Sequence, residues 1–154
     1  MMYSFLLTIH SLFRWLVLVG MVYAIFRAYK GWFNNLEFSK FDNSVRHITA
    51  TIAHIQLIFG ICLYCISPIV QYFLHNFKDA IHERQIRFFG MEHSSMMLLA
   101  IIIITIGSAL SKRKTTDKAK FKTMALSYTL AFIIILVNIP WSFSPLISRP
   151  LFRF

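Results

Sequence analysis

The chain has 154 residues, of which 57% are hydrophobic and only 14% are charged, and its mean hydropathy is +0.62. Soluble globular domains carry about a quarter charged residues, so this composition excludes an ordinary soluble globule, a disordered chain, a collagen-like fibre and, with only two cysteines, a disulfide scaffold. The net charge of +10 would suit a nucleic-acid-binding protein, but the basic residues lie in short segments between apolar runs, which is typical of a membrane protein.

Four apolar runs extend over residues 5–26, 48–70, 88–110 and 124–143. Each is close to or longer than the roughly 20 residues that cross a bilayer core of about 30 Å as a helix. None alternates strictly between apolar and polar residues, as a strand would. Backbone polar groups in lipid must be satisfied within their own segment, so each run is predicted to be a membrane-spanning helix. The predicted fold is all-α, an integral membrane four-helix bundle formed by one domain, residues 1–154.

The first run, residues 5–26, contains His10 and Arg14 within its apolar stretch. A charged residue at the centre of a membrane helix costs about 2.5–3.5 kcal/mol on insertion scales, so such a residue is a functional candidate. The two residues are four apart and therefore share a face of the helix. The segment that follows, residues 27–47, carries four Lys and Arg residues.

The second run, residues 48–70, contains His54 and a CxxC pair, Cys62 and Cys65. A membrane thiol oxidoreductase would need a further cysteine pair, and a mid-helix position disfavours a disulfide. Both cysteines are therefore predicted to be core residues. A quinone site needs one or two hydrogen-bond donors, and His54 and Gln56 could provide them. Residues two apart on a helix do not share a face, however, which weakens this interpretation.

Residues 71–87 alternate aromatic and charged side chains and are predicted to lie on the outer membrane surface as a short amphipathic helix. The third run, residues 88–110, contains Glu92 and His93 near its start. Arg14 is predicted either to pair with Glu92 or to bind a haem propionate through charge-assisted hydrogen bonds.

Residues 111–123 carry six Lys and Arg residues, and the fourth run, residues 124–143, contains no histidine. Because this segment and residues 27–47 hold most of the basic residues, the positive-inside rule places both in the cytoplasm and both termini outside. The predicted location is the bacterial cytoplasmic (inner) membrane, which the chain crosses several times.

Depth in the membrane limits which histidines can share a cofactor. At about 1.5 Å per residue, His10 and His93 lie at a similar level in the outer leaflet, whereas His54 lies near the midplane or in the inner half. A bis-histidine haem needs two imidazoles from different helices at similar depth. His10 and His93 are therefore predicted to bind the iron of one haem b, with Arg14 near a propionate. His54 is predicted to be a buried hydrogen-bond partner or, if the boundaries shift, a ligand.

Three function hypotheses follow, and hydrolysis and nucleotide chemistry are not among them, because no corresponding motif occurs. The first is a b-type haem protein that transfers electrons, with a quinone or respiratory membrane proteins as partners. The second is a non-catalytic subunit of a larger complex, held together by an Arg14–Glu92 salt bridge and hydrogen-bonded histidines. The third is a proton-coupled transporter, for which four spans are few unless the chain oligomerises.

Several stretches of the chain carry a family resemblance: HSLFRW (10–15), AHIQLIFGICLYCISP (53–68), RFFGMEHSSMM (87–97) and IPW (139–141). They resemble a family of small, uncharacterised four-helix bacterial membrane proteins often labelled cytochrome-b-like. The resemblance implies functional roles for His10, His54 and His93 and for the charged pair Arg14 and Glu92. Other four-helix b cytochromes frequently hold two haems on two histidine pairs, and this sequence departs from them because it has no clear second pair.

Overall fold

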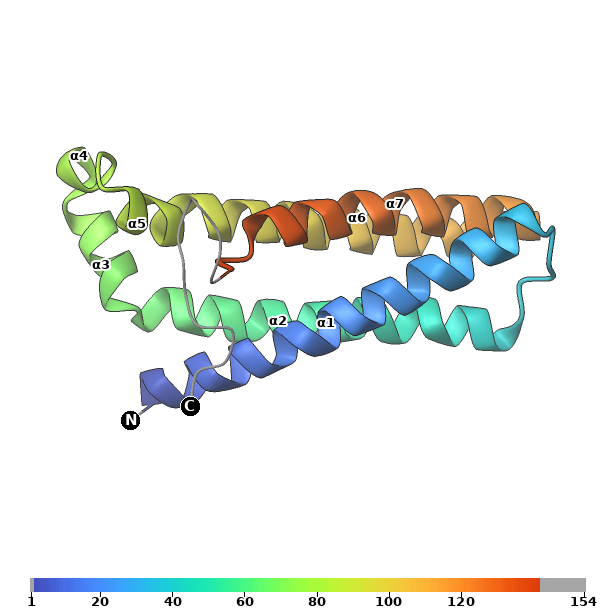
Figure 1. Cartoon of the computed structure of the whole chain (residues 1–154), viewed down its shortest axis with the longest axis horizontal. Coiled ribbons are helices and arrows are strands. Elements are labelled where there is room, and N and C mark those ends of the chain that lie inside the picture. The colour runs from blue at the N-terminus through green and yellow to red at the C-terminus, as the bar shows by residue number, and fades with distance from the viewer. Residues whose placement is uncertain (1, 142–154) are drawn as a thin grey trace.

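The computed structural model describes residues 2–141, and every regular element within them is a helix (Figure 1). The long helices are α1 (Met2–Phe33), α2 (Lys40–Ile66), α6 (His93–Arg113) and α7 (Asp117–Asn138). α6 is preceded without a break by α5 (Arg84–Arg87) and the π-helical turn η1 (Phe88–Glu92). Four helical segments are long and apolar enough to cross a membrane, and they contain the four predicted runs, apart from the ends of the second and fourth.

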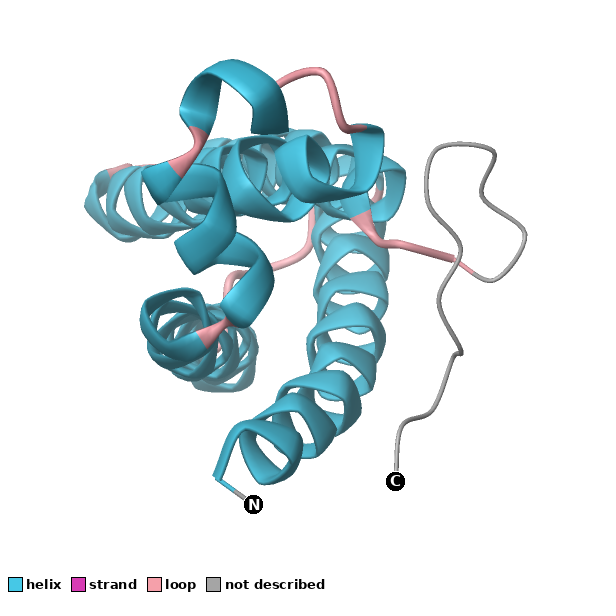
Figure 2. Ribbon diagram, turned by 90° about the vertical axis from the view of Figure 1, so that its left-hand side faces the viewer, coloured by secondary structure: helices cyan, strands magenta, loops and turns pink. Residues whose placement is uncertain are grey.

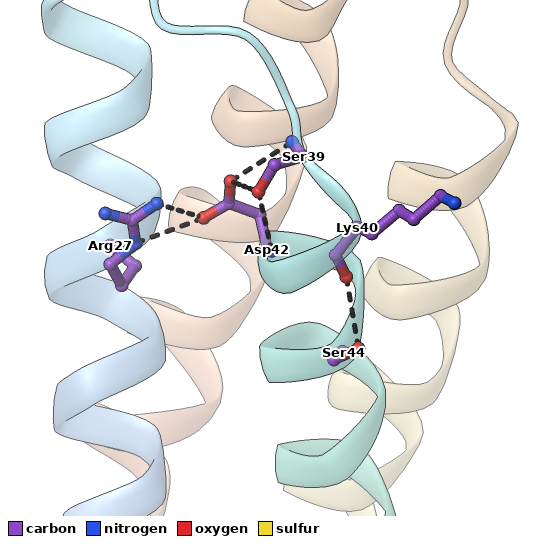
Figure 3. Close-up of polar contacts among 5 residues, drawn as sticks. All are labelled: Arg27, Ser39, Lys40, Asp42 and Ser44. Atoms are coloured by element: carbon purple, nitrogen blue, oxygen red, sulfur yellow. Dashed lines mark hydrogen bonds and ion pairs between the residues drawn. The ribbon is translucent and has the colours of Figure 1, made fainter.

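The helices extend beyond the apolar runs, so the connections are short. α1 continues to Phe33 and α2 begins at Lys40, where Ser39 and Asp42 form a capping box: each side chain accepts a hydrogen bond from the other's backbone N–H, both at 3.2 Å (Figure 3). Arg27 on α1 also contacts the Asp42 carboxylate, with 2.6 Å between Nη2 and Oδ1. These contacts join the end of α1 to the start of α2.

Asp42 precedes the apolar run of α2 by six residues and lies outside the predicted membrane-spanning part, although its side chain is only 2% exposed. Burial by itself would raise the pKa of the Asp42 carboxyl. Hydrogen bonds from Ser39 and Arg27 outweigh this effect, so the pKa lies below its ordinary value. Asp42 is therefore an ionised link between the two helices at neutral pH.

Prolines divide the chain at the other end of the bundle. α2 ends at Ile66 and not at residue 70 as predicted, because Ser67 is extended and Pro68 begins the next helix. The single amphipathic helix predicted for residues 71–87 is in fact three short helices, α3 (Pro68–His75), α4 (Phe77–Ala80) and α5. α7 ends at Asn138, two residues before Pro140; the last two residues of the fourth predicted run lie outside the described residues.

The four long helices alternate in direction and form a ring (Figures 1 and 2). α1 packs against α2 and α7, and α6 packs against α7 and α2, so α1 and α6 lie diagonally across the bundle. α1 and α6 start at the end that holds α3, α4 and α5, here called the α3 end (Figure 1). The opposite end, formed by residues 27–47 and 111–123, is here called the basic end.

The core combines many small residues with a few large side chains, and large apolar residues cover the outside. Ala24, Ala28, Ala53, Ala125 and Ala131 are fully buried. Large apolar side chains such as those of Leu16, Val19, Ile58 and Ile133 are more than half exposed along the helices, and this pattern suits a bundle surrounded by lipid. The prediction that Cys62 and Cys65 are core residues is wrong, because both are exposed on α2 with free thiols.

Candidate functional site

A cavity of about 450 Å³ lies at the α3 end of the bundle, between the four long helices. His10 and Arg14 of α1 and His93 of α6 line it, and most of its other lining side chains are apolar. The two histidines predicted to act together therefore share one cavity, although they come from diagonal helices. We call this space the histidine cavity.

His93 is held by the end of α7. Its Nδ1 lies 2.8 Å from the backbone oxygen of Asn138, the last residue of that helix, where carbonyl groups lack helical partners. A carbonyl oxygen only accepts hydrogen bonds, so Nδ1 must carry a proton and donate it. In the neutral ring the lone pair then belongs to Nε2, which is the form of histidine that binds a metal ion.

His10 is positioned by two residues of α2. Gln56 donates a hydrogen bond from Nε2 to the His10 backbone oxygen at 3.0 Å. Gly60 lies beside the ring, and a Cβ at this position would be 3.5 Å from His10 Cε1. The buried Nδ1 of His10 has no hydrogen-bond partner among residues 2–141. A buried polar atom of this kind calls for an explanation, and a bound ligand is one.

Arg14 also lines the cavity, but it does not pair with Glu92. Its Nη2 donates to Ser11 Oγ at 3.3 Å, and its guanidinium lies 5.5 Å from the ring centroid of Trp15. Glu92 instead accepts from Nε of Arg87 at 2.6 Å. The predicted Arg14–Glu92 salt bridge is therefore wrong.

The π-helical turn η1 explains this different pairing. Glu92 is the fifth residue after Arg87, a spacing that places side chains on different faces of an α-helix. In η1 the backbone N–H of His93 bonds to Phe88 O, five residues back, and this wider turn brings side chains with this spacing closer to one face. The turn thus brings Arg87 and Glu92 together immediately before His93.

Neighbouring helices hold η1 in place. The hydroxyl of Tyr64 on α2 donates to Gly90 O at 2.9 Å. Gly90 also packs so closely on Phe73 of α3 that any Cβ would overlap the ring. π-helical turns occur frequently at functional sites. Sequence analysis missed this turn, whose only signal is a glycine that follows two phenylalanines at the start of the third run.

His54 lies apart from the other two histidines. Its Nε2 is 2.8 Å from Thr105 Oγ1, and it lines a second cavity of about 230 Å³ between α2 and α6. The structure thus gives His54 a hydrogen-bond partner and does not bring it to the histidine cavity.

A bare metal ion would find few ligands here. Among the residues that the structure describes, no group of three or more His, Cys, Asp or Glu side chains could hold a metal ion. Two histidines are enough only where the remaining ligands come from a cofactor, as the four porphyrin nitrogens do in haem. Two imidazoles are the protein donors that a bis-histidine haem requires.

Comparison with known proteins does not place the chain in a family. No family model, curated protein or solved structure matches it. The resemblance to cytochrome-b-like membrane proteins therefore stays a prediction, and the residues of the cavity carry the functional conclusion.

Proposed function

We propose that the protein is a b-type haem protein of the bacterial cytoplasmic membrane, which binds one haem b in the histidine cavity and takes part in electron transfer. One observation carries the proposal: His10 and His93, expected at the same depth on separate helices, line the same cavity. His54, expected at another depth, lines a different one.

The residues of the cavity fit haem in three respects. A volume of about 450 Å³ falls within the roughly 300–1,000 Å³ of cofactor-sized pockets. His93 donates from Nδ1 to a backbone carbonyl, and histidines that bind metals through Nε2 almost always make such a bond, because it fixes the ring orientation. His10 adds a second imidazole with a buried, unpartnered Nδ1 in the described part of the chain.

When bound, haem supplies a one-electron redox couple. The protein side chains hold the group and set its surroundings. His10 and His93 would bind the iron, and Arg14, on the His10 face of α1, would neutralise a propionate. The apolar lining, including Val17, Leu57 and Ile135, would limit water and so influence the potential.

The distribution of charge supports one orientation in the membrane. Residues 27–47 and 111–123, at the basic end, would lie in the cytoplasm. The histidine cavity is at the other end and would lie in the outer leaflet, with both termini outside. Electrons would then be exchanged near the outer face, with a quinone or respiratory membrane proteins as partners.

A reduced-minus-oxidised absorption spectrum tests the proposal. The protein is made with ample haem, purified in mild detergent and reduced with dithionite, and the His93→Ala and His54→Ala variants are treated alike. We expect the sharp bands of a b-type haem in wild type and His54→Ala, and their loss in His93→Ala. His54 is the matched control because it is also a half-buried, hydrogen-bonded histidine of the bundle.

Wild-type protein without haem bands, both as purified and after reconstitution with haem, would contradict the proposal. That outcome would favour the alternative, a non-catalytic membrane subunit or scaffold of a larger complex. The alternative was based on an Arg14–Glu92 salt bridge and on hydrogen-bonded histidines. The structure has the Arg87–Glu92 pair in place of that salt bridge, and it contains interhelical hydrogen bonds of His93 and His54.

A further inference from the structure

The second cavity, of about 230 Å³, lies toward the basic end between α2 and α6, and we call it the basic cavity. Its lining is cationic and polar, with Arg46, His47, Thr51, His54, Thr105, Ser108 and Lys112 beside two alanines. None of these lining residues is acidic. The described residues that surround this space therefore present positive charge and hydrogen-bond donors.

Arg46 is the most unusual of these residues, because its charged side chain is only 5% exposed. Its Nη1 donates to the backbone oxygen of Ser108 at 3.0 Å and also to Ser108 Oγ, and its Nη2 donates to Asn43 Oδ1 at 2.8 Å. All these acceptors are neutral. The buried Nε of Arg46 has no partner within residues 2–141.

No carboxylate in the described part of the chain balances this charge. Asp42 lies one helical turn before Arg46, but its Oδ1 accepts from Arg27 and its Oδ2 from Ser39. Burial of a charge without a counterion is costly unless hydrogen bonds and an opposite charge compensate. Hydrogen bonds are present around Arg46, and the opposite charge is what the site lacks.

We propose that the basic cavity binds the phosphate group of an anionic phospholipid. Arg46 would supply the buried charge, and Lys112 and His47, which are exposed, would approach the phosphate from the rim. Basic pockets between membrane helices on the cytoplasmic side are known to bind anionic headgroups. The inference rests on the membrane-spanning part of the proposed function and is independent of haem.

The surface beside the cavity favours a lipid over free phosphate. Ile58 follows His54 by four residues and Ile102 precedes Thr105 by three, so each lies on the cavity-lining face of its helix. Both lie one turn farther from the basic end, along the length of the bundle. Both are exposed, at 59% and 45%. α2 and α6 also make the least extensive contact of the neighbouring long helices, so acyl chains would lie along these exposed apolar side chains.

Thermal unfolding of delipidated protein in a neutral detergent measures this binding, because a ligand of the folded state raises the midpoint. Phosphatidylglycerol, phosphatidylcholine and inorganic phosphate are titrated separately. The test variant is Lys112→Gln, since Arg46 bridges two helices and its loss can unfold the bundle. Lys114→Gln is the matched control: it removes the same charge from an exposed residue two positions away that does not line the cavity.

We expect phosphatidylglycerol to raise the midpoint more than phosphatidylcholine or phosphate does. Its affinity should fall about fivefold in Lys112→Gln, the loss expected for one lysine near an anionic lipid, and stay unchanged in Lys114→Gln. Equal shifts by the two lipids, equal loss in the two variants, or a shift by inorganic phosphate alone as large as that by phosphatidylglycerol would overturn the proposal. If one of these results occurs while the reduced-minus-oxidised spectrum still shows haem bands, the lipid-site proposal is wrong and the haem proposal is unaffected.

Discussion

The half-buried histidines of this bundle differ in what their ring nitrogens contact. His93 donates to a carbonyl at the end of a helix, whereas His54 meets the hydroxyl of Thr105. Thr105 donates its own proton to Ile101 O, so its oxygen accepts from His54 Nε2. In the neutral rings, His93 therefore donates from Nδ1 and keeps its lone pair on Nε2, whereas His54 donates from Nε2.

The capping box at Ser39 provides a test with a control on the same helix. Ser39→Ala removes the side-chain acceptor for the Asp42 N–H, and we expect it to lower the free energy of unfolding by about 1 kcal/mol. Ser44 only donates back to Lys40 O within the helix (Figure 3). Ser44→Ala should leave stability unchanged or slightly higher, because alanine is the better helix former.

Denaturant titration of both variants in detergent measures the difference. If Ser39→Ala is as stable as Ser44→Ala, the prediction is wrong, and the Ser39 side chain does not contribute to the stability of this helix start.

Single residues show how far the candidate site could be predicted. That His10 and His93 line one cavity was predictable, because the rise per residue of a helix sets the depth of each side chain. The partner of Glu92 was not, since one π-helical turn changes which side chains align. Arg46 was assigned to a basic loop, although it lies in the second turn of α2 and is buried there; only packing against α6 reveals its place.

Individual helices follow local signals more closely than they follow hydropathy. The apolar runs correctly predict four long helices, but the helices continue through charged residues to a cap or a proline. Hydropathy reports which residues tolerate lipid, whereas caps and prolines decide where the backbone leaves the helix. The break between α2 and α3 depends on such signals at Ser67 and Pro68.

Glycines test how closely these helices pack. A Cβ at Gly107 of α6 would overlap the side chain of Ser127 on α7, so Gly107→Ala should destabilise the bundle by about 1–3 kcal/mol. Gly20 of α1 has only Thr49 nearby, at 3.9 Å from an added Cβ. Gly20→Ala should therefore be neutral or stabilising, because alanine favours the helix.

Thermal midpoints of the two variants in one detergent measure the effect. If Gly107→Ala and Gly20→Ala have the same thermal midpoint, the prediction is wrong, and α6 and α7 can move apart at this contact without loss of stability.

The whole molecule has two chemically different ends. The α3 end holds the histidine cavity, and the basic end holds the basic cavity and most of the Lys and Arg residues. This polarity matches a protein with fixed orientation in a membrane. It would also separate the proposed haem site from the proposed lipid site along the bundle.

Cysteine labelling in intact bacterial cells tests the orientation. In a Cys62→Ser, Cys65→Ser background, Lys78→Cys of α4 should react with a membrane-impermeant maleimide without permeabilisation. Thr115→Cys, in the turn between α6 and α7, should react only after the membrane is opened. Both positions are exposed, so access alone decides the result. Labelling of Thr115→Cys but not Lys78→Cys in intact cells would reverse the proposed topology.

The electron paramagnetic resonance spectrum of the oxidised protein tests most directly whether two imidazoles share one iron. Two imidazole ligands give a low-spin ferric haem, and loss of either leaves a weaker axial ligand. We predict a low-spin signal in wild type and His54→Ala, and a high-spin signal or no haem in His10→Ala and His93→Ala. A high-spin wild type, or a His10→Ala variant that stays low-spin while His54→Ala does not, would contradict the account.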